Sequence, residues 1–76
     1  MANESKELIE FIAKAIVSEP GDVNVNVVDD GEQLELETAD DDRGRVIGRQ
    51  GRVAKAMRAV LQASRQGRDT RLEIVD

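Results

Sequence analysis

The fold is decided by residues 43–58, which read RGRVIGRQGRVAKAMR. At the centre of this stretch lies Gly48-Arg49-Gln50-Gly51, between two segments whose apolar residues recur at helical spacing. The stretch holds six basic residues and no acidic residue. Two glycines around two polar residues let a backbone approach a ligand closely, because glycine has no Cβ. We therefore expect two helices joined by a tight basic turn that is open to an anionic ligand.

The turn leads straight into the second of these helices. The first N–H groups of a helix have no partner within the helix, and the helix dipole is positive at that end, so a phosphate binds there favourably. Arg49 projects from the turn, and Arg52 lies just inside the helix. Apolar neighbours of the turn are expected to form the floor of a groove. The predicted binding residues are Arg43, Arg45, Val46, Ile47, Gly48, Arg49, Gln50, Gly51, Arg52, Val53 and Lys55.

Charge is divided sharply along the chain. Residues 1–42 carry thirteen acidic and two basic side chains, a net charge of −11, whereas residues 43–76 carry nine basic and three acidic ones, a net charge of +6. The overall charge of −5 therefore conceals a basic half. Phosphates respond to the local field over about 8–10 Å, so such a chain can bind nucleic acid. The alternative interpretation is a solvated acidic face beside a solvated basic face.

The N-terminal segment predicts an amphipathic helix. Its apolar stripe comprises Leu8, Phe11, Ile12, Ala15 and Ile16. Phe11 is the only aromatic residue of the chain and is expected in the core. Asn3 and Ser5 are candidate N-caps. The helix should end near Ser18, because Pro20 removes a backbone N–H and cannot continue it.

A β-hairpin is predicted next. Residues 23–27 alternate valine with asparagine, and residues 33–38 alternate leucine with polar side chains, a period of two that is typical of strands. Asp30-Gly31 favours a type I′ turn, whose two central residues need positive φ. One face of the hairpin then holds three opposed pairs, which are Val27 with Leu34, Val25 with Leu36, and Val23 with Thr38.

The run Asp40-Asp41-Asp42 has two interpretations. Three adjacent carboxylates suit a metal ion, but a better explanation is that Asp40 or Asp41 caps a short helix through Val46-Ile47. Acidic residues in the first turn of that helix suit its dipole.

The C-terminal part predicts a long helix and a strand. The helix opens at Gly51 and should end near Gln66, with Gly67 as its C-cap. Its apolar stripe comprises Val53, Met57, Val60, Leu61 and Ser64. Residues 71–75 form a short strand, with Leu72 and Ile74 pointing inward.

The predicted order is helix, strand, strand, short helix, helix, strand, within a single domain of residues 1–76. This order indicates a two-layer α+β fold with the helices on one face of a three-stranded sheet. The chain has no cysteine and no histidine, so a disulfide or a typical zinc site cannot support its thin core, and a dimer is a remaining means of stabilisation. No segment is typical of a signal peptide or a membrane span, so we expect a soluble cytoplasmic protein without a membrane partner.

With VIGRQGR in this setting, the chain resembles KH domains, whose G-x-x-G loop clamps about four nucleotides of single-stranded backbone. The element order is similar to the bacterial, type II arrangement. The N-terminal KELIEFIAKAIVSEP and the basic stretch resemble the small stand-alone KH proteins of bacteria, the KH-domain protein A family. The resemblance implies that Gly48 and Gly51 are the loop glycines, that Arg49 and Gln50 face phosphates, and that Ile47 lies at the groove floor.

The same resemblance implies a non-catalytic, cytoplasmic protein that binds single-stranded RNA. It implies a post-transcriptional regulator or RNA chaperone that affects cell division and envelope homeostasis. The expected protein partner is a second copy of the chain or a larger KH protein of the Jag type. RNA rather than DNA follows from the resemblance alone.

Two other classes of function are alternatives. In the first, the chain is a protein–protein module in which the acidic half of one copy meets the basic half of another, and the loop is not the main binding site. In the second, it is an enzyme. The chain has no histidine, cysteine or tyrosine and no G-K-[ST] phosphate loop, so no catalytic residue, cofactor, metal or small-molecule substrate is expected.

Overall fold

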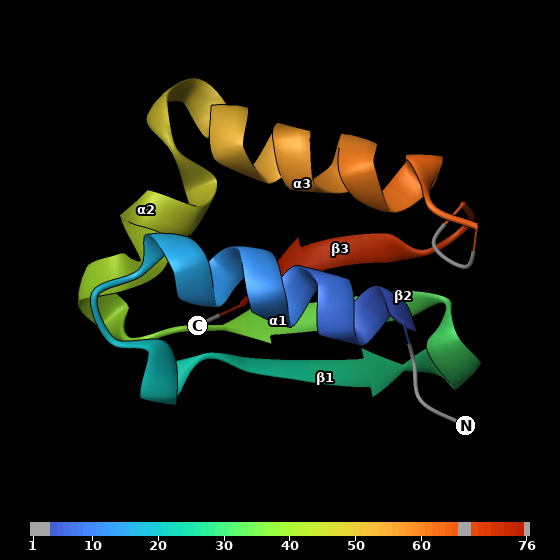
Figure 1. Ribbon diagram of the computed structural model, residues 1–76, viewed down its shortest axis with the longest axis horizontal. Helices are drawn as coiled ribbons and strands as arrows, with labels where there is room; N and C mark the ends of the chain where they lie inside the picture. The colour runs from blue at the N-terminus through green and yellow to red at the C-terminus, as the bar shows by residue number, and fades with distance from the viewer. Residues whose placement is uncertain (1–3, 66–67, 76) are drawn as a thin grey trace.

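The computed structural model describes residues 4–65 and 68–75. Within these residues, three helices and three strands follow one another in the predicted order, joined in places by short 3₁₀ turns. The elements are α1 (Glu4–Ile16), β1 (Asn24–Val28), β2 (Gln33–Glu37), α2 (Arg43–Ile47), α3 (Arg52–Ala63) and β3 (Arg71–Ile74). The helices form one layer over one face of the sheet (Figure 1). The predicted α+β architecture is therefore confirmed.

The sheet has the order β1-β2-β3, with β1 antiparallel and β3 parallel to β2. Val25 lies opposite Leu36 and Val27 opposite Leu34, as the hairpin prediction requires. Asp30 and Gly31 have φ values of 57° and 93°, and the Glu32 N–H donates to the Asp29 carbonyl at 3.1 Å. These are the features of a type I′ turn, so turn chemistry and side-chain alternation act together to set the register.

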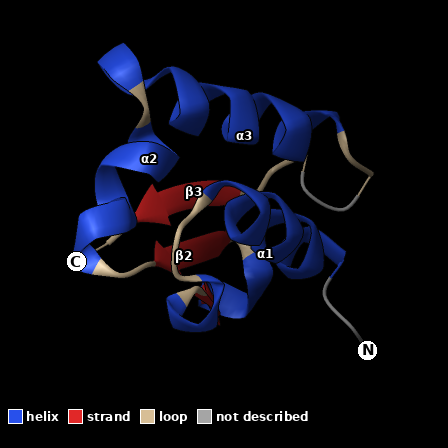
Figure 2. Ribbon diagram, turned by 60° about the vertical axis from the view of Figure 1, so that its left-hand side comes forward, coloured by secondary structure: helices blue, strands red, loops and turns tan. Residues whose placement is uncertain are grey.

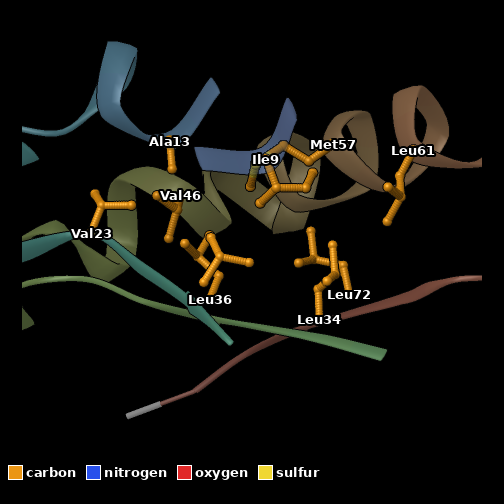
Figure 3. Packing of buried hydrophobic residues seen from close by; sticks show 10 residues of the cluster. Ile9, Ala13, Val23, Leu34, Leu36, Val46, Met57, Leu61 and Leu72 are labelled. Atoms are coloured by element: carbon orange, nitrogen blue, oxygen red, sulfur yellow. The ribbon is translucent and has the colours of Figure 1, made fainter. Parts of the chain in front are cut away.

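The core lies between the sheet and the helical layer (Figure 3). Its buried cluster comprises Ile9, Ala13, Val23, Val25, Leu34, Leu36, Val46, Met57, Leu61 and Leu72. Every helix and every strand of the described chain contributes to this list. Leu72 points inward as predicted, and Ile74 packs against the cluster with part of its surface exposed.

The face of α1 that is buried differs from the predicted one. Ser5, Ile9 and Ala13 are buried, whereas the side chain of Phe11 is 75% exposed, so the expectation of a core role for Phe11 is wrong. Ser5 lies inside the helix and is not its N-cap, and Asn3 lies outside the described residues. Apolar residues occupy more than one face of α1, so the periodicity alone could not select the face that meets the sheet.

The long helix α3 ends at Ala63, three residues before the predicted end. The Ser64 N–H donates to the carbonyls of Val60 and Leu61, and the Ser64 Oγ donates to the Leu61 carbonyl at 2.7 Å. Gln66 and Gly67 lie outside the described residues. The buried face of α3 is Ala54, Met57 and Leu61. Val60, predicted for this stripe, is instead 45% exposed.

Asp42 has a role that the sequence did not suggest. Its carboxylate is fully buried and accepts hydrogen bonds from the Ser18 N–H at 3.0 Å, the Ser18 hydroxyl at 2.8 Å and the Glu19 N–H at 3.0 Å. Arg45 lies alongside, with Nε 3.3 Å from Oδ1. The bond from the Ser18 N–H lowers the pKa of this carboxyl below its usual range. The other donors add to the shift, and burial opposes it.

The expected capping by Asp40 or Asp41 is wrong. No side-chain oxygen caps α2, because a 3₁₀ turn precedes the helix and the Arg43 N–H is satisfied by the Asp40 carbonyl. Asp42 instead ties the end of α1 to the start of α2, across 24 positions of sequence. Within residues 4–65 and 68–75, no group of acidic side chains is arranged to hold a metal ion. None of the described helices is long and apolar enough to cross a membrane.

Candidate nucleic-acid interface

Gly48 ends α2 and folds the turn tightly against α3. Its N–H donates to the Gly44 carbonyl at 2.8 Å, and its φ and ψ of 78° and 171° lie in a region essentially restricted to glycine. A Cβ at this position would lie 2.5 Å from Val53 Cγ2 and 2.8 Å from the Val53 nitrogen. Both the backbone conformation and the packing therefore require glycine at position 48.

Gly51 opens α3 and has a different environment. Gln50 and Gly51 have φ values of 57° and 76°, and the Arg52 N–H donates to the Arg49 carbonyl, which closes the turn. A Cβ added to Gly51 would meet nothing within 4 Å. No side chain caps the start of α3. The surface at Gly51 is therefore open at the start of α3, where the helix dipole is positive, a geometry that suits an approaching anion.

The predicted cations fall into two groups. Arg49, Arg52 and Lys55 are exposed, and none of these three side chains has a hydrogen-bond or ion-pair partner within the described chain. Arg43 instead pairs with Asp40 at 3.1 Å, and Arg45 pairs with Asp42 at 3.3 Å. The structure thus brings three available cations to the start of α3 and holds two others against the acidic run.

The apolar residues beside the turn also fall into two groups, partly exposed and buried. Ile47 is 37% exposed, and Val53 is half-buried with its inner side against the core. These two side chains can form an apolar floor next to the turn. Val46 and Ala54 are buried, so a ligand cannot reach them. Val46 belongs to the buried core against which Val53 packs, in contrast to the direct contact with the ligand expected for it.

Sequence reasoning left Arg58 out of the site. Its Nε donates to the Leu72 carbonyl at 3.2 Å and so joins α3 to the free edge of β3. A pocket of about 260 Å³ lies at this junction, lined by Arg58, Gln62, Thr70, Arg71, Leu72 and Glu73. Arg58 is one of the six basic residues of the stretch 43–58, but no local sequence pattern indicates that it lies over β3.

The fold and the turn together define the class of protein. The order α-β-β-α-α-β, a mixed three-stranded sheet and a glycine-bounded turn between the last two helices make this a type II KH domain. The chain belongs to the KhpA/KhpB KH domain family, which matches residues 6–75.

Curated relatives agree with this assignment. The RNA-binding protein KhpA of Halalkalibacterium halodurans is 49% identical over 75 residues, covering 93% of this chain and 99% of the relative. The protein of the same name from Treponema pallidum is 46% identical over 81 residues, covering all of both chains. The one from Clostridium perfringens is 52% identical over 61 residues, covering 78% of this chain and 81% of the relative. No solved structure matches the chain.

Proposed function

We propose that the chain binds single-stranded RNA, without catalysis, through the turn Gly48–Gly51 and the apolar floor beside it. The observation that carries this proposal is the coincidence of three cations, which have no partner among the described residues, with the open, uncapped start of α3. The relatives that match most of the chain are named RNA-binding proteins, which supports RNA as the ligand.

The geometry suggests different roles for these residues in binding phosphates and bases. Phosphate oxygens would lie at the positive end of the α3 dipole and would accept hydrogen bonds from the side chains of Arg49 and Arg52. Bases would lie against Ile47 and Val53, because these provide the exposed apolar surface next to the turn. Arg43 and Arg45 would act mainly through the local field, since each already faces an aspartate. Phosphate contacts of this kind position a strand and carry little sequence information.

The finer functional assignments rest on the family. We infer a single-domain cytoplasmic protein that acts after transcription, as a regulator or RNA chaperone in cell division and envelope homeostasis. We infer that the protein partner is a second copy or a larger KH protein, and the family description, which names KhpB together with KhpA, is consistent with a second KH protein as partner.

The test is fluorescence anisotropy of a short, labelled, unstructured RNA, titrated at two salt concentrations. Wild-type binding should weaken as salt rises, because a phosphate clamp releases counterions. The double variant Arg49→Asp, Gln50→Asp should bind at least ~tenfold more weakly, because it replaces a phosphate donor by two repelling carboxylates.

The matched control is the double variant Lys6→Asp, Asn24→Asp. It changes the net charge by the same amount, on α1 and at the start of β1, away from the turn. It should bind RNA almost as the wild type does. If both variants lost the same RNA affinity, the loss would follow from net charge and not from the turn. A folded turn variant with full affinity would refute the proposed site, and no binding by the wild type would favour the protein–protein module.

A further inference from the structure

The two edges of the sheet are protected to different degrees. At the β3 edge, Arg58 Nε donates to the Leu72 carbonyl. Arg71 and Glu73 add charged side chains to this strand. Charged side chains and covering elements are the usual means by which an edge strand avoids pairing with another chain. β1 instead reads NVNVV, without a charged residue, a proline or a bulge in its pairing with β2, so its own sequence contains none of these protections.

The hydrogen bonds between β2 and β3 show which way the backbone of each residue points. The Arg71 N–H donates to the Glu32 carbonyl at 2.8 Å. The Val75 N–H donates to the Leu36 carbonyl at 3.0 Å. Because backbone groups alternate in direction along a strand, the even-numbered residues of β2 face β3 and the odd-numbered residues face β1.

The free edge of β1 follows from this alternation. The odd-numbered residues of β2 lie opposite Asn24, Asn26 and Val28, which therefore bond to β2. The backbone N–H and C=O groups of Val25 and Val27 point the other way, and they have no hydrogen-bond partner among residues 4–65 and 68–75. β1 therefore presents two donors and two acceptors, the groups with which an added strand pairs.

The inner face of this edge suits an aliphatic side chain. The side chains of Val25 and Val27 share the face that the helices cover, and Val25 belongs to the buried core. Val27 remains 41% exposed, so the helical layer does not fully cover the end of β1. An aliphatic side chain on an added strand would remove this apolar surface from water.

The outer face and the ends of β1 suit cations. Asn26 Nδ2 donates to Glu37 Oε1 at 2.8 Å, which holds the Glu37 carboxylate toward β1. Asp22 precedes the strand and Asp29 follows it, and both are exposed. A segment that pairs with β1 therefore meets acidic side chains on its outer face and at both of its ends.

We propose that β1 accepts an extended segment of another protein as a fourth, antiparallel strand, in which aliphatic residues alternate with lysine or arginine. Residues directly opposite in an antiparallel pair share a face, so the aliphatic side chains lie beside Val27. The basic side chains lie on the outer face near Glu37, and those at the ends of the segment lie near Asp22 and Asp29. Main-chain hydrogen bonds provide the affinity, and the alternation provides the specificity.

Charge disfavours two other occupants of this edge. Two β1 strands from two copies of the chain, paired antiparallel, would bring both Glu37 carboxylates onto one face and would place Asp22 of one copy near Asp29 of the other. Like charges opposed across strands are destabilising. The phosphates of an RNA would meet the same carboxylates.

The edge of β1 lies apart from the basic turn. Figure 1 shows β1 at the lower edge of the sheet and β3 at the upper edge, and Figures 1 and 2 both place the turn between α2 and α3 at the top of the molecule. Strand addition at β1 is therefore independent of the proposed RNA binding and can be measured without RNA.

The first experiment is a titration of the full chain with the capped peptide Lys-Val-Lys-Val-Lys-Val-Lys, followed by NMR of the backbone amides. The amide signals of Val25 and Val27 should shift to saturation, because their N–H groups gain hydrogen bonds, whereas that of Arg52 should not move. The peptide Glu-Val-Glu-Val-Glu-Val-Glu should bind at least ~tenfold more weakly, because its charges repel those around β1.

A pair of methylated peptides with equal charge separates strand addition from simple charge attraction. In an antiparallel fourth strand, the valines opposite Val25 and Val27 direct their N–H groups toward β1, and the lysines direct theirs to solvent. N-methylation of the valines should therefore raise the dissociation constant at least ~tenfold. N-methylation of the lysines should leave the dissociation constant nearly unchanged.

A pair of protein variants tests the same edge from the other side. Val27→Pro removes an edge N–H without removing a bond to β2, and it should weaken binding of the lysine peptide at least ~tenfold. Val27→Thr keeps the N–H and the β-branched shape, and it should weaken binding much less. Circular dichroism checks that both variants fold. Three results would overturn the proposal: no shift at Val25 and Val27 in the wild type, equal affinity of the two methylated peptides, or a folded Val27→Pro variant that binds as tightly as Val27→Thr.

Discussion

Two turns of this molecule have almost the same backbone and opposite charge. In the hairpin, Asp30 has φ and ψ of 57° and 32°, and the Glu32 N–H bonds to the Asp29 carbonyl. In the basic turn, Gln50 has φ and ψ of 57° and 24°, and the Arg52 N–H bonds to the Arg49 carbonyl. In each turn the following glycine also has positive φ. One turn reverses a strand, whereas the other starts a helix.

The two turns differ in the element that each of them introduces. After Gly31 the chain pairs with β1, so its N–H groups are used in the sheet. After Gly51 the chain enters α3, and no side chain caps the start of this helix, where its dipole is positive. A left-handed pair of residues is therefore not sufficient for the proposed site, which also has a helix start and three available cations next to the turn.

The largest expected effect separates the two glycines of the basic turn. Gly48→Ala should lower the free energy of unfolding by about 3–4 kcal/mol, because a Cβ overlaps Val53 and the backbone region excludes other residues. Gly51→Ala should lower it by about 1–2 kcal/mol, because only the left-handed conformation is strained. Urea denaturation followed by circular dichroism measures both. Equal losses would mean that the contact with Val53 does not matter.

The next effect compares an anchor of the hairpin turn with the anchor of α2, the helix that precedes the basic turn. The hairpin turn is held by the Thr70 hydroxyl, which donates to the Gly31 carbonyl at 3.1 Å, so Thr70→Val should cost about 1 kcal/mol. Asp42 anchors the base of α2, and Asp42→Asn should cost more, because a buried acceptor of three hydrogen bonds is altered. Urea denaturation of both variants ranks the two anchors, and a larger loss for Thr70→Val would reverse this order.

Acid provides a specific test of the Asp42 anchor. The pKa of Asp42 is lowered in the folded chain, so its contribution is present above the ordinary carboxyl pKa and is lost as pH falls through the folded value. The stability difference between wild type and Asp42→Asn should therefore shrink below about pH 4. A difference that stays constant from neutral pH down to strong acid would contradict this role.

The smallest effect concerns the residue before Gly31 in the hairpin turn and the residue before Gly51 in the basic turn. Gln50→Asn should raise the free energy of unfolding by about 0.5 kcal/mol, because asparagine tolerates positive φ better than glutamine. Asp30→Asn should change little, since aspartate already tolerates this conformation. Thermal denaturation compares the two substitutions. A larger gain at Asp30 than at Gln50 would show that the turns are not equivalent in strain.

The sequence could predict the parts of the fold that depend on neighbouring residues. The type I′ turn and the alternation of residues 24–28 and 33–37 set the hairpin register, which the structure confirms. The glycines at 48 and 51 placed the end of α2 and the start of α3 correctly. Family resemblance supplied the expected ligand, which stereochemistry alone could not.

Other features required the tertiary structure. The periodicity of α1 admitted more than one buried face, and only packing against the sheet and α3 selected the one that leaves Phe11 in solvent. Likewise, only the fold brings Asp42 to Ser18, or Arg58 to the Leu72 carbonyl.

The sequence by itself thus determined the order of the elements, the hairpin register and the basic turn, because each depends on backbone preferences of adjacent residues. The tertiary structure decided which apolar side chains are exposed and which carboxylate is buried. The physical reason is that these properties depend on contacts between residues far apart in the chain, and local sequence patterns do not specify such contacts.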